Sequence, residues 1–251
     1  MPILVLQHGE SASVGLGRLA PILRDLGFTT DIRRPDLAAK TSAGARGIPV
    51  DLDNVQGVIS LGGRMNVGDP EHPWIAAEID YLRRAHERQL PVIGICLGHQ
   101  LLAKALGGDV GPAAKAGWGF CRVTQTPAGN VEAMLGGIPW GTYQFQNHFQ
   151  EVTKLPEGAT VLAGSKECRV QCFRAGLRSF GFQYHFEYTK GQIEGFLRDE
   201  ACRKEMAQAG VTPAEMQKQV EEHFESYDRL STRLCANLAG MLFPAVKRLK
   251  V

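Results

Sequence analysis

Residues 91–100 of the 251-residue chain read PVIGICLGHQ. The apolar run after Pro91 predicts a short buried strand, and a helix is expected to begin near Gly98. Cys96 therefore stands in a sharp turn from strand to helix. A nucleophile on such a turn needs small neighbours two residues away, and Gly94 and Gly98 fill those positions. The pattern predicts a nucleophile elbow with cysteine in place of serine.

Short apolar runs alternate with longer amphipathic stretches around this turn. Strands are predicted at 2–7, 28–33 and 56–61, helices at 15–26 and 74–88, and four strands of a more antiparallel half within 118–186. This alternation is typical of an α/β fold in which a mostly parallel twisted sheet is flanked by helices.

The chain from about residue 189 onward has a helical pattern. We therefore predict an α/β domain at 1–190 and a C-terminal helical extension, packed on it, at 191–251. The last helix is expected to open with a capping box at Thr212 and Glu215, with Pro213 at the first helical position. An apolar stripe follows at Met216, Val220, Phe224, Tyr227, Leu230, Leu234 and Leu238. It either covers the chain's own sheet or, as the sharper alternative, forms a homodimer interface.

The position of Cys96 has chemical consequences. A sulfur atom at a helix N-terminus favours the thiolate, which is the attacking species. The same geometry directs the backbone N–H of Leu97 at the oxyanion that attack would create. A second donor is expected from Gly62 or Gly63, at the end of the predicted strand 56–61.

A base is predicted near the end of residues 181–187, which read GFQYHFE. His185 and Glu187 are two residues apart, and alternation along a strand would place both on one face. Glu187 can then orient the imidazole of His185 as the third member of a triad. His8 and Glu10, after the first predicted strand, are candidates for the rim of the site, whereas His99 is interpreted as a packing or hydrogen-bonding residue.

Both catalytic segments follow patterns of a known family. The chain resembles the class I glutamine amidotransferases, which carry G-x-C-x-G-x-Q and, later, G-x-Q-[FY]-H-x-E, from about Val5 to Glu187. The resemblance implies a flavodoxin-like three-layer sandwich. It also implies that Gln100 and the segment Asn147, His148 and Phe149 contact the substrate. The family's second motif usually reads His-Pro-Glu, and here Phe186 takes the place of proline.

The resemblance implies cysteine-dependent hydrolysis of a γ-glutamyl amide, glutamine to glutamate and ammonia, through a thioester on Cys96. Three alternatives stay open: a γ-glutamyl peptidase that acts alone, a regulatory module without turnover, and a docking subunit of a larger amidotransferase. We expect a small-molecule substrate. Any synthetase that accepts the ammonia would be a separate subunit.

Composition limits the classes of partner and the location that we expect for the protein. The 28 basic and 26 acidic residues give a net charge of +2 without long runs of one sign, which argues against nucleic acid. No apolar stretch reaches the roughly 20 residues that cross a bilayer, and no signal peptide is recognisable, so we expect a cytoplasmic protein. The six cysteines form no CxxC pair and are interpreted as separate thiols. We expect neither a metal nor an organic cofactor.

Overall fold

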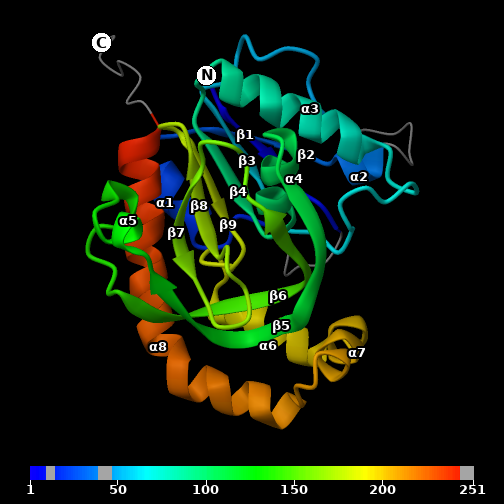
Figure 1. The fold of residues 1–251 in the computed structure, drawn as a ribbon, viewed down its shortest axis with the longest axis vertical. Helices are drawn as coiled ribbons and strands as arrows, with labels where there is room; N and C mark the ends of the chain where they lie inside the picture. Colours follow the sequence, from blue (N-terminus) through cyan, green and yellow to red (C-terminus); the bar gives the residue numbers. More distant parts are fainter. Residues whose placement is uncertain (10–14, 39–46, 244–251) are drawn as a thin grey trace.

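A nine-stranded sheet runs through the part of the chain that the computed structural model describes, residues 1–9, 15–38 and 47–243. Its strand order is β2-β1-β3-β4-β9-β8-β7-β5-β6 (Figure 1). Neighbours are parallel from β2 to β9 and antiparallel from β9 to β6. The strands are β1 (Ile3–Leu6), β2 (Thr30–Arg33), β3 (Gly57–Ser60), β4 (Val92–Ile95), β5 (Asp109–Gln125), β6 (Gly141–Lys154), β7 (Thr160–Gly164), β8 (Cys172–Ala175) and β9 (Ser179–Phe182).

Helices cover both faces of the parallel half. The helices of the described residues are α1 (Leu19–Asp25), α2 (Pro35–Ala38), α3 (Trp74–Glu87), α4 (Leu97–Ala105), α5 (Pro127–Asn130), the 3₁₀ turn η1 (Ala133–Leu135), α6 (Lys190–Arg198), α7 (Glu200–Gln208), α8 (Pro213–Asn237) and the π-helical turn η2 (Leu238–Leu242). Successive side chains of a strand point to opposite faces. Ile3 and Val5 accordingly pack with α1 and the end of α8, whereas Leu4 and Leu6 pack with α3 and α4. This arrangement confirms the predicted α/β class.

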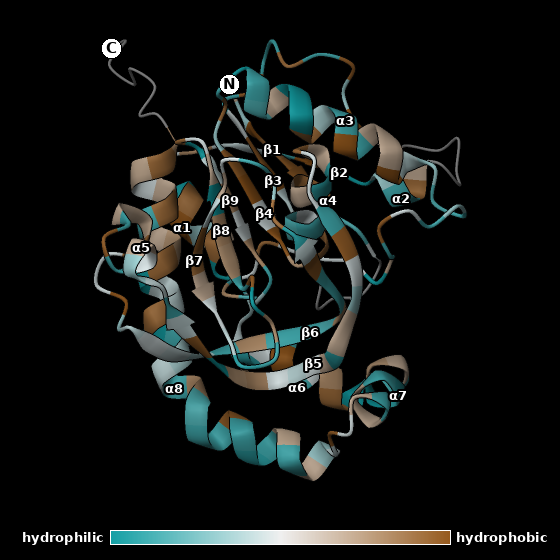
Figure 2. Cartoon of the chain, viewed as in Figure 1, coloured by the Kyte–Doolittle hydropathy of each residue, from teal (hydrophilic) through white to brown (hydrophobic). Residues whose placement is uncertain are grey.

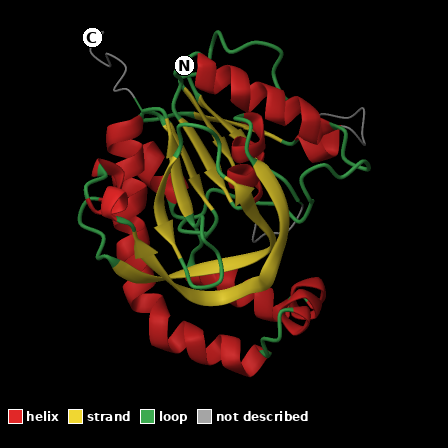
Figure 3. Cartoon of the chain, in the orientation of Figure 1, coloured by secondary structure: helices red, strands yellow, loops and turns green. Residues whose placement is uncertain are grey.

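The long antiparallel pair β5–β6 curves across one end of the sheet, and the C-terminal helices lie against it (Figure 3). Trp118, Phe120 and Phe145 from this pair form a separate core cluster with residues of α6, α7 and α8. The central strands are mostly hydrophobic, whereas the outer part of α8 is mostly hydrophilic (Figure 2). The C-terminal extension is thus attached through one apolar face.

Several predicted boundaries were wrong. The first helix begins at Leu19, the second strand begins at Thr30, and β5 starts at Asp109, well before the predicted run. Strand β6 was not predicted, because its buried positions include polar residues such as Gln144 and Gln146, which hide the apolar alternation.

The last strand also ends earlier than predicted. β9 stops at Phe182, whose carbonyl accepts a hydrogen bond from Cys96 N at 2.8 Å. Beyond Phe182 the neighbouring segment is no longer β4 but α4, so β9 has no strand there to pair with. His185 therefore lies outside the strand and makes one isolated antiparallel bridge with Phe145.

The predicted start of α8 is confirmed. Thr212 and Glu215 form the capping box, and Pro213 is the first helical residue. The stripe residues from Met216 to Leu238 are buried against the chain's own core, apart from Phe224, which is partly buried. The intramolecular alternative therefore accounts for the stripe. No helix of the described residues is both long and apolar enough to cross a membrane.

Candidate active site

Cys96 occupies a strained turn between β4 and α4. Its backbone has φ 53° and ψ −105°, a positive φ that non-glycine residues seldom adopt. A Cβ added to Gly94 would lie 2.4 Å from the carbonyl oxygen of Gly98, and one added to Gly98 would lie 2.1 Å from that of Ser60. Both contacts are far below van der Waals distance. The two glycines are thus required for β4, α4 and β3 to meet, as the sequence predicted.

His185 and Glu187 form a buried pair after β9. Nδ1 of His185 lies 2.6 Å from Oε1 of Glu187, and both side chains are almost completely buried. The other ring nitrogen, Nε2, has no hydrogen-bond partner among the described residues. The carboxylate therefore fixes one edge of the imidazole and leaves the other free for a reacting group.

Cys96 and the imidazole of His185 meet beside Gly62. A Cβ added to this residue would lie 2.8 Å from Cε1 of His185, 3.6 Å from its Nε2 and 3.5 Å from Cβ of Cys96. Gly63 is equally confined, by His8 and Leu97, at 2.9 Å each. Only glycine leaves this space open, so backbone at Gly62 and Gly63 borders the space between thiol and base.

The charge environment keeps His185 protonated. Burial alone would lower the pKa of its imidazole, but the negative charge of Glu187, with a contribution from Cys96, raises that pKa to about 10. An imidazolium beside a cysteine favours the thiolate. The raised pKa of His185 thus places a positive charge beside the sulfur of Cys96.

A cavity of about 520 Å³ opens over these residues. Besides Cys96 and His185 it is lined by glycines 62 and 63, by the predicted substrate-binding residues, and by side chains that the sequence did not single out for this site: Arg64, Met65, Asn66, Gln150, Tyr188, Phe196, Asp199, Cys202 and Glu205. Four of these follow residue 190. The C-terminal extension thus supplies one wall of the cavity, which no motif indicated, because these residues lie beyond both catalytic segments.

Gln100 lies in the cavity wall, but its side-chain amide is engaged within the protein. Its Nε2 donates to the carbonyl of Gln150 at 2.9 Å and to Oε1 of Gln183 at 3.1 Å. His148 also donates to the Gln150 carbonyl, through Nδ1 at 2.9 Å, and burial lowers the pKa of His148 to about 4, so it is neutral. Both residues fix the backbone of β6.

Asn147 and Phe149 are the more open members of the predicted substrate-binding set. Oδ1 of Asn147 is buried and has no hydrogen-bond partner among the described residues, and it lines the cavity. Phe149 is 38% exposed and also borders the cavity. Both residues border the cavity, and their contact with the substrate stays a prediction.

Two of the remaining predictions concern histidines near the strand ends. His8 lines the cavity, and its Nε2 lies 2.8 Å from Oε2 of Glu78, whose Oε1 accepts a 2.6 Å bond from Ser60. His99 is absent from the cavity lining, packs its ring against Phe173, and has a pKa lowered to about 3 by burial, which agrees with a packing role. The other rim candidate, Glu10, lies outside the described residues.

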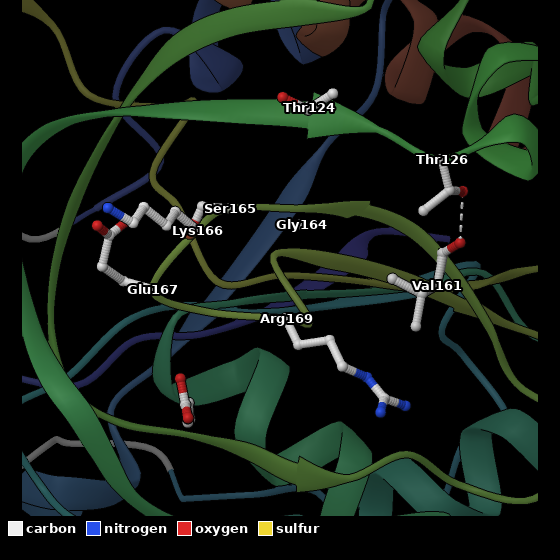
Figure 4. Close-up of a pocket in the computed structure, with 9 residues that line it drawn as sticks. Thr124, Thr126, Val161, Gly164, Ser165, Lys166, Glu167 and Arg169 are labelled. Carbon is white, nitrogen blue, oxygen red and sulfur yellow. Dashed lines mark hydrogen bonds between the residues drawn. The ribbon is translucent and has the colours of Figure 1, made fainter.

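A second depression lies between β5, β7 and the turn after β7 (Figure 4). It measures about 700 Å³ and opens broadly to solvent. Its charged residues Lys166, Glu167 and Arg169 are exposed, and Thr126 donates to the carbonyl of Val161 at its edge. The lining includes neither Cys96 nor His185. Among the described residues no group of three or more His, Cys, Asp or Glu could hold a metal ion.

The fold and the cysteine turn together define a class of protein. The family model for class I glutamine amidotransferases matches residues 17–202. The chain is therefore an enzyme of the class I glutamine amidotransferase family.

Curated relatives are about one third identical to it over the stretches that match. A subunit of the glutamine-hydrolysing GMP synthase from Archaeoglobus fulgidus is 34% identical over 67% of this chain and 88% of its own. The corresponding protein from Sulfurisphaera tokodaii is 37% identical over 50% of this chain and 66% of its own. Gamma-glutamyl peptidase 3 of Arabidopsis thaliana is 33% identical over 56% of this chain and 57% of its own. The chain spans only 23% of a probable GMP synthase from Leptospira interrogans.

Solved structures agree in fold. A glutamine amidotransferase from Methylobacillus flagellatus superposes with a TM-score of 0.82 at 24% identity, over 98% of this chain and 97% of the other. A glutamine amidotransferase from Thermotoga maritima superposes with a TM-score of 0.77 at 23% identity, over 95% of this chain and 99% of the other. These matches include the C-terminal helices, most of which the family model does not cover.

Proposed function

We propose that the protein hydrolyses a γ-glutamyl amide with Cys96 as nucleophile, His185 as general acid and base, and Glu187 as the residue that orients it. The observation that carries the proposal is the space beside Gly62, which Cys96 and His185 share. The bond from His185 to Glu187 supports the same assignment, since it leaves Nε2 directed at the reacting atoms.

The first half-reaction would form a thioester. The Cys96 thiolate attacks the γ-carbonyl carbon, and the carbonyl oxygen takes up the negative charge. The backbone N–H of Leu97, in the first turn of α4, has no partner within its helix, and a second donor comes from Gly62 or Gly63. As the tetrahedral intermediate collapses, the C–N bond breaks and the His185 imidazolium gives its proton to the departing nitrogen.

The second half-reaction would release glutamate. His185, now neutral, accepts a proton from water while the water oxygen attacks the thioester carbonyl. The C–S bond breaks, Cys96 leaves as the thiolate, and the imidazolium is restored. Neither half-reaction requires a cofactor.

The size of the cavity favours substrates larger than glutamine as a second candidate. Its volume of about 520 Å³ falls in the range of sites that hold drug-sized ligands. The wall from Phe196, Asp199, Cys202 and Glu205 extends it beyond the space around Cys96. A γ-glutamyl peptide, with its leaving amine along this wall, fits that shape, and a relative carries the name gamma-glutamyl peptidase.

Partner and location are part of the same proposal. The similarity to subunits of GMP synthases supports a separate synthetase that would receive ammonia from this chain. The six unpaired cysteines fit a reducing compartment such as the cytoplasm. A homodimer would have to use an exposed surface, since most of the apolar stripe of α8 is already buried.

The test is glutamate release from glutamine and from a panel of γ-glutamyl dipeptides, with Cys96→Ala as the control. We expect release by the unchanged protein alone, and higher kcat/KM for the dipeptides if the extended wall binds the leaving group. Release that persists in Cys96→Ala would refute the assigned nucleophile. If neither protein releases glutamate, the unchanged protein is treated with a glutamine-like electrophile. Labelling of Cys96 would indicate a competent site that requires its synthetase, and no labelling would indicate an inactive site.

A further inference from the structure

The segment that carries the base, residues 185–188, belongs to no strand or helix. It links β9 to α6, whose N-cap is Thr189. Among the described residues, its one backbone hydrogen bond to a strand of the sheet runs from His185 N to Phe145 O at 2.8 Å. Such a link has free backbone torsions, so the direction of the imidazole must be set by other contacts.

Two residues distant in sequence hold three of the four carbonyl groups of this segment. The hydroxyl of Tyr227, on α8, donates to the carbonyl of His185 at 2.7 Å and to that of Tyr188 at 3.2 Å. The backbone N–H of Arg18 donates to the carbonyl of Glu187 at 2.8 Å, and its guanidinium donates to the carbonyl of Tyr188.

The two residues also hold each other. The guanidinium of Arg18 lies 5.1 Å from the ring centroid of Tyr227 and forms an ion pair with Asp228, the next residue of α8. Tyr227 is 1% exposed and Arg18 is 7% exposed. Gly17 completes the fit, since a Cβ there would lie 1.9 Å from the carbonyl oxygen of Glu187. A buried, cross-linked set of donors therefore surrounds the backbone of the base.

The imidazole is coupled to this backbone by stacking as well. The rings of His185 and Tyr188 lie 4.1 Å apart at 8°. Because Tyr227 and Arg18 fix the carbonyl of Tyr188, they also fix the ring that supports the imidazole. Tyr227 and Asp228 lie beyond residue 202, where the match to the family model ends.

We propose that Tyr227 and Arg18 are positioning residues that hold the imidazole of His185 in line with Cys96, so that helix α8 is a working part of the active site. The inference rests on the proposed function of Cys96 and His185. Removing the Tyr227 hydroxyl takes the donor from the carbonyl of His185 and leaves that of Tyr188 with the Arg18 guanidinium alone. This loosens the segment without touching substrate. The effect should therefore fall on the chemical steps more than on binding.

Tyr227→Phe tests this, with Tyr81→Phe as the matched control. Tyr81 is also fully buried, and its hydroxyl donates to a backbone carbonyl, that of Asp51 at 3.2 Å, but on α3 and away from the cavity. We expect Tyr227→Phe to lower kcat about tenfold with KM changed less than about twofold. The rate of Cys96 alkylation by iodoacetamide, measured across pH, should fall too, while Tyr81→Phe matches the unchanged protein in both assays.

Alkylation needs no turnover, so it tests the positioning role even if glutamine and the dipeptides prove not to be substrates. Equal losses in Tyr227→Phe and Tyr81→Phe would overturn the proposal, because they would reflect general destabilisation. So would an unchanged kcat and alkylation profile in folded Tyr227→Phe. If that variant does not fold, Asp228→Asn replaces it, since it weakens the Arg18 contact from the surface of α8. The same losses then support the proposal, and their absence overturns it.

Discussion

The two halves of the candidate site are built differently. The nucleophile side consists of β3, β4 and α4, where Cys96 follows its strand directly and the glycines 94 and 98 allow close backbone contacts. The base side carries His185 on a link after β9, held by contacts from Phe145, Arg18 and Tyr227. Regular secondary structure fixes the first half, and backbone and side-chain contacts from distant segments fix the second.

This difference indicates which property, folding or activity, a substitution in each half would affect. On the nucleophile side the available space is set by backbone atoms, which cannot move without disturbing the central parallel strands. On the base side, part of the same work is done by hydrogen bonds from the side chains of Tyr227 and Arg18, which can be removed one at a time. We therefore expect substitutions on the nucleophile side to affect folding first, and those on the base side to affect activity first.

The largest effect is expected from Gly98→Ala. The added carbon would lie 2.1 Å from the carbonyl oxygen of Ser60, a backbone atom that β3 holds in place. We expect the free energy of unfolding to fall by more than about 3 kcal/mol, measured by urea denaturation. Gly195→Ala in α6 is the control: its added carbon meets nothing within 4 Å, and helix propensity predicts a gain of about 0.5–1 kcal/mol. Similar stability of the two variants would contradict the tight fit at Gly98.

The next effect belongs to the base side. Glu187→Gln keeps the shape of the side chain but removes the charge that raises the pKa of His185 to about 10. Burial then lowers this pKa, so the imidazolium is lost at neutral pH. We expect kcat for γ-glutamyl substrates to fall on the order of a hundredfold or more.

The alkylation rate of Cys96 against pH checks the cause. At neutral pH it should be lower in Glu187→Gln than in the unchanged protein, because the variant lacks the imidazolium beside the sulfur. Glu194→Gln, on α6 outside the cavity lining, serves as the control and should leave the profile in place. A Glu187→Gln profile that matches the parent would show that Glu187 does not set the charge of His185.

Sequence reasoning succeeded on the nucleophile side because its constraints are local. A buried strand, two glycines and a helix within ten residues predicted the turn at Cys96, and the backbone there has that turn. The boundaries of the parallel strands beside it, β1 and β3, were also close to those predicted. Here the local sequence pattern and the tertiary structure both require the same sharp turn with glycines beside Cys96.

The base side was predicted less completely, because its supports are far apart in the chain. His185 and Glu187 were identified as a pair, but on a strand that in fact ends at Phe182. Strand β6 escaped notice because glutamines occupy its buried positions. Tyr227 was assigned only to an apolar stripe, since a helical period reveals its burial but not the partner of its hydroxyl.

The smallest of the expected effects is a pH dependence of stability on the nucleophile side, at His8. Burial alone would lower the pKa of this imidazole, but Glu78, with help from Asp36, raises it above the ordinary value. A raised pKa means that His8 contributes stability fully below about pH 6.5 and loses it as pH rises through the folded pKa. Glu78→Gln removes the main source of the raised pKa and therefore most of this contribution.

Urea denaturation between about pH 6 and pH 9 measures the difference. The free energy of unfolding of the unchanged protein should exceed that of Glu78→Gln most at the acid end. This difference should shrink with rising pH by no more than about 1.4 kcal/mol per pH unit, the limit for one proton. Glu87→Gln, at the exposed end of α3, should show a gap that does not vary with pH. A constant gap for Glu78→Gln as well would mean that His8 stays neutral. The pair would then act through hydrogen bonding alone, and Glu78 would hold the strand end beside Gly62 and Gly63 without charge.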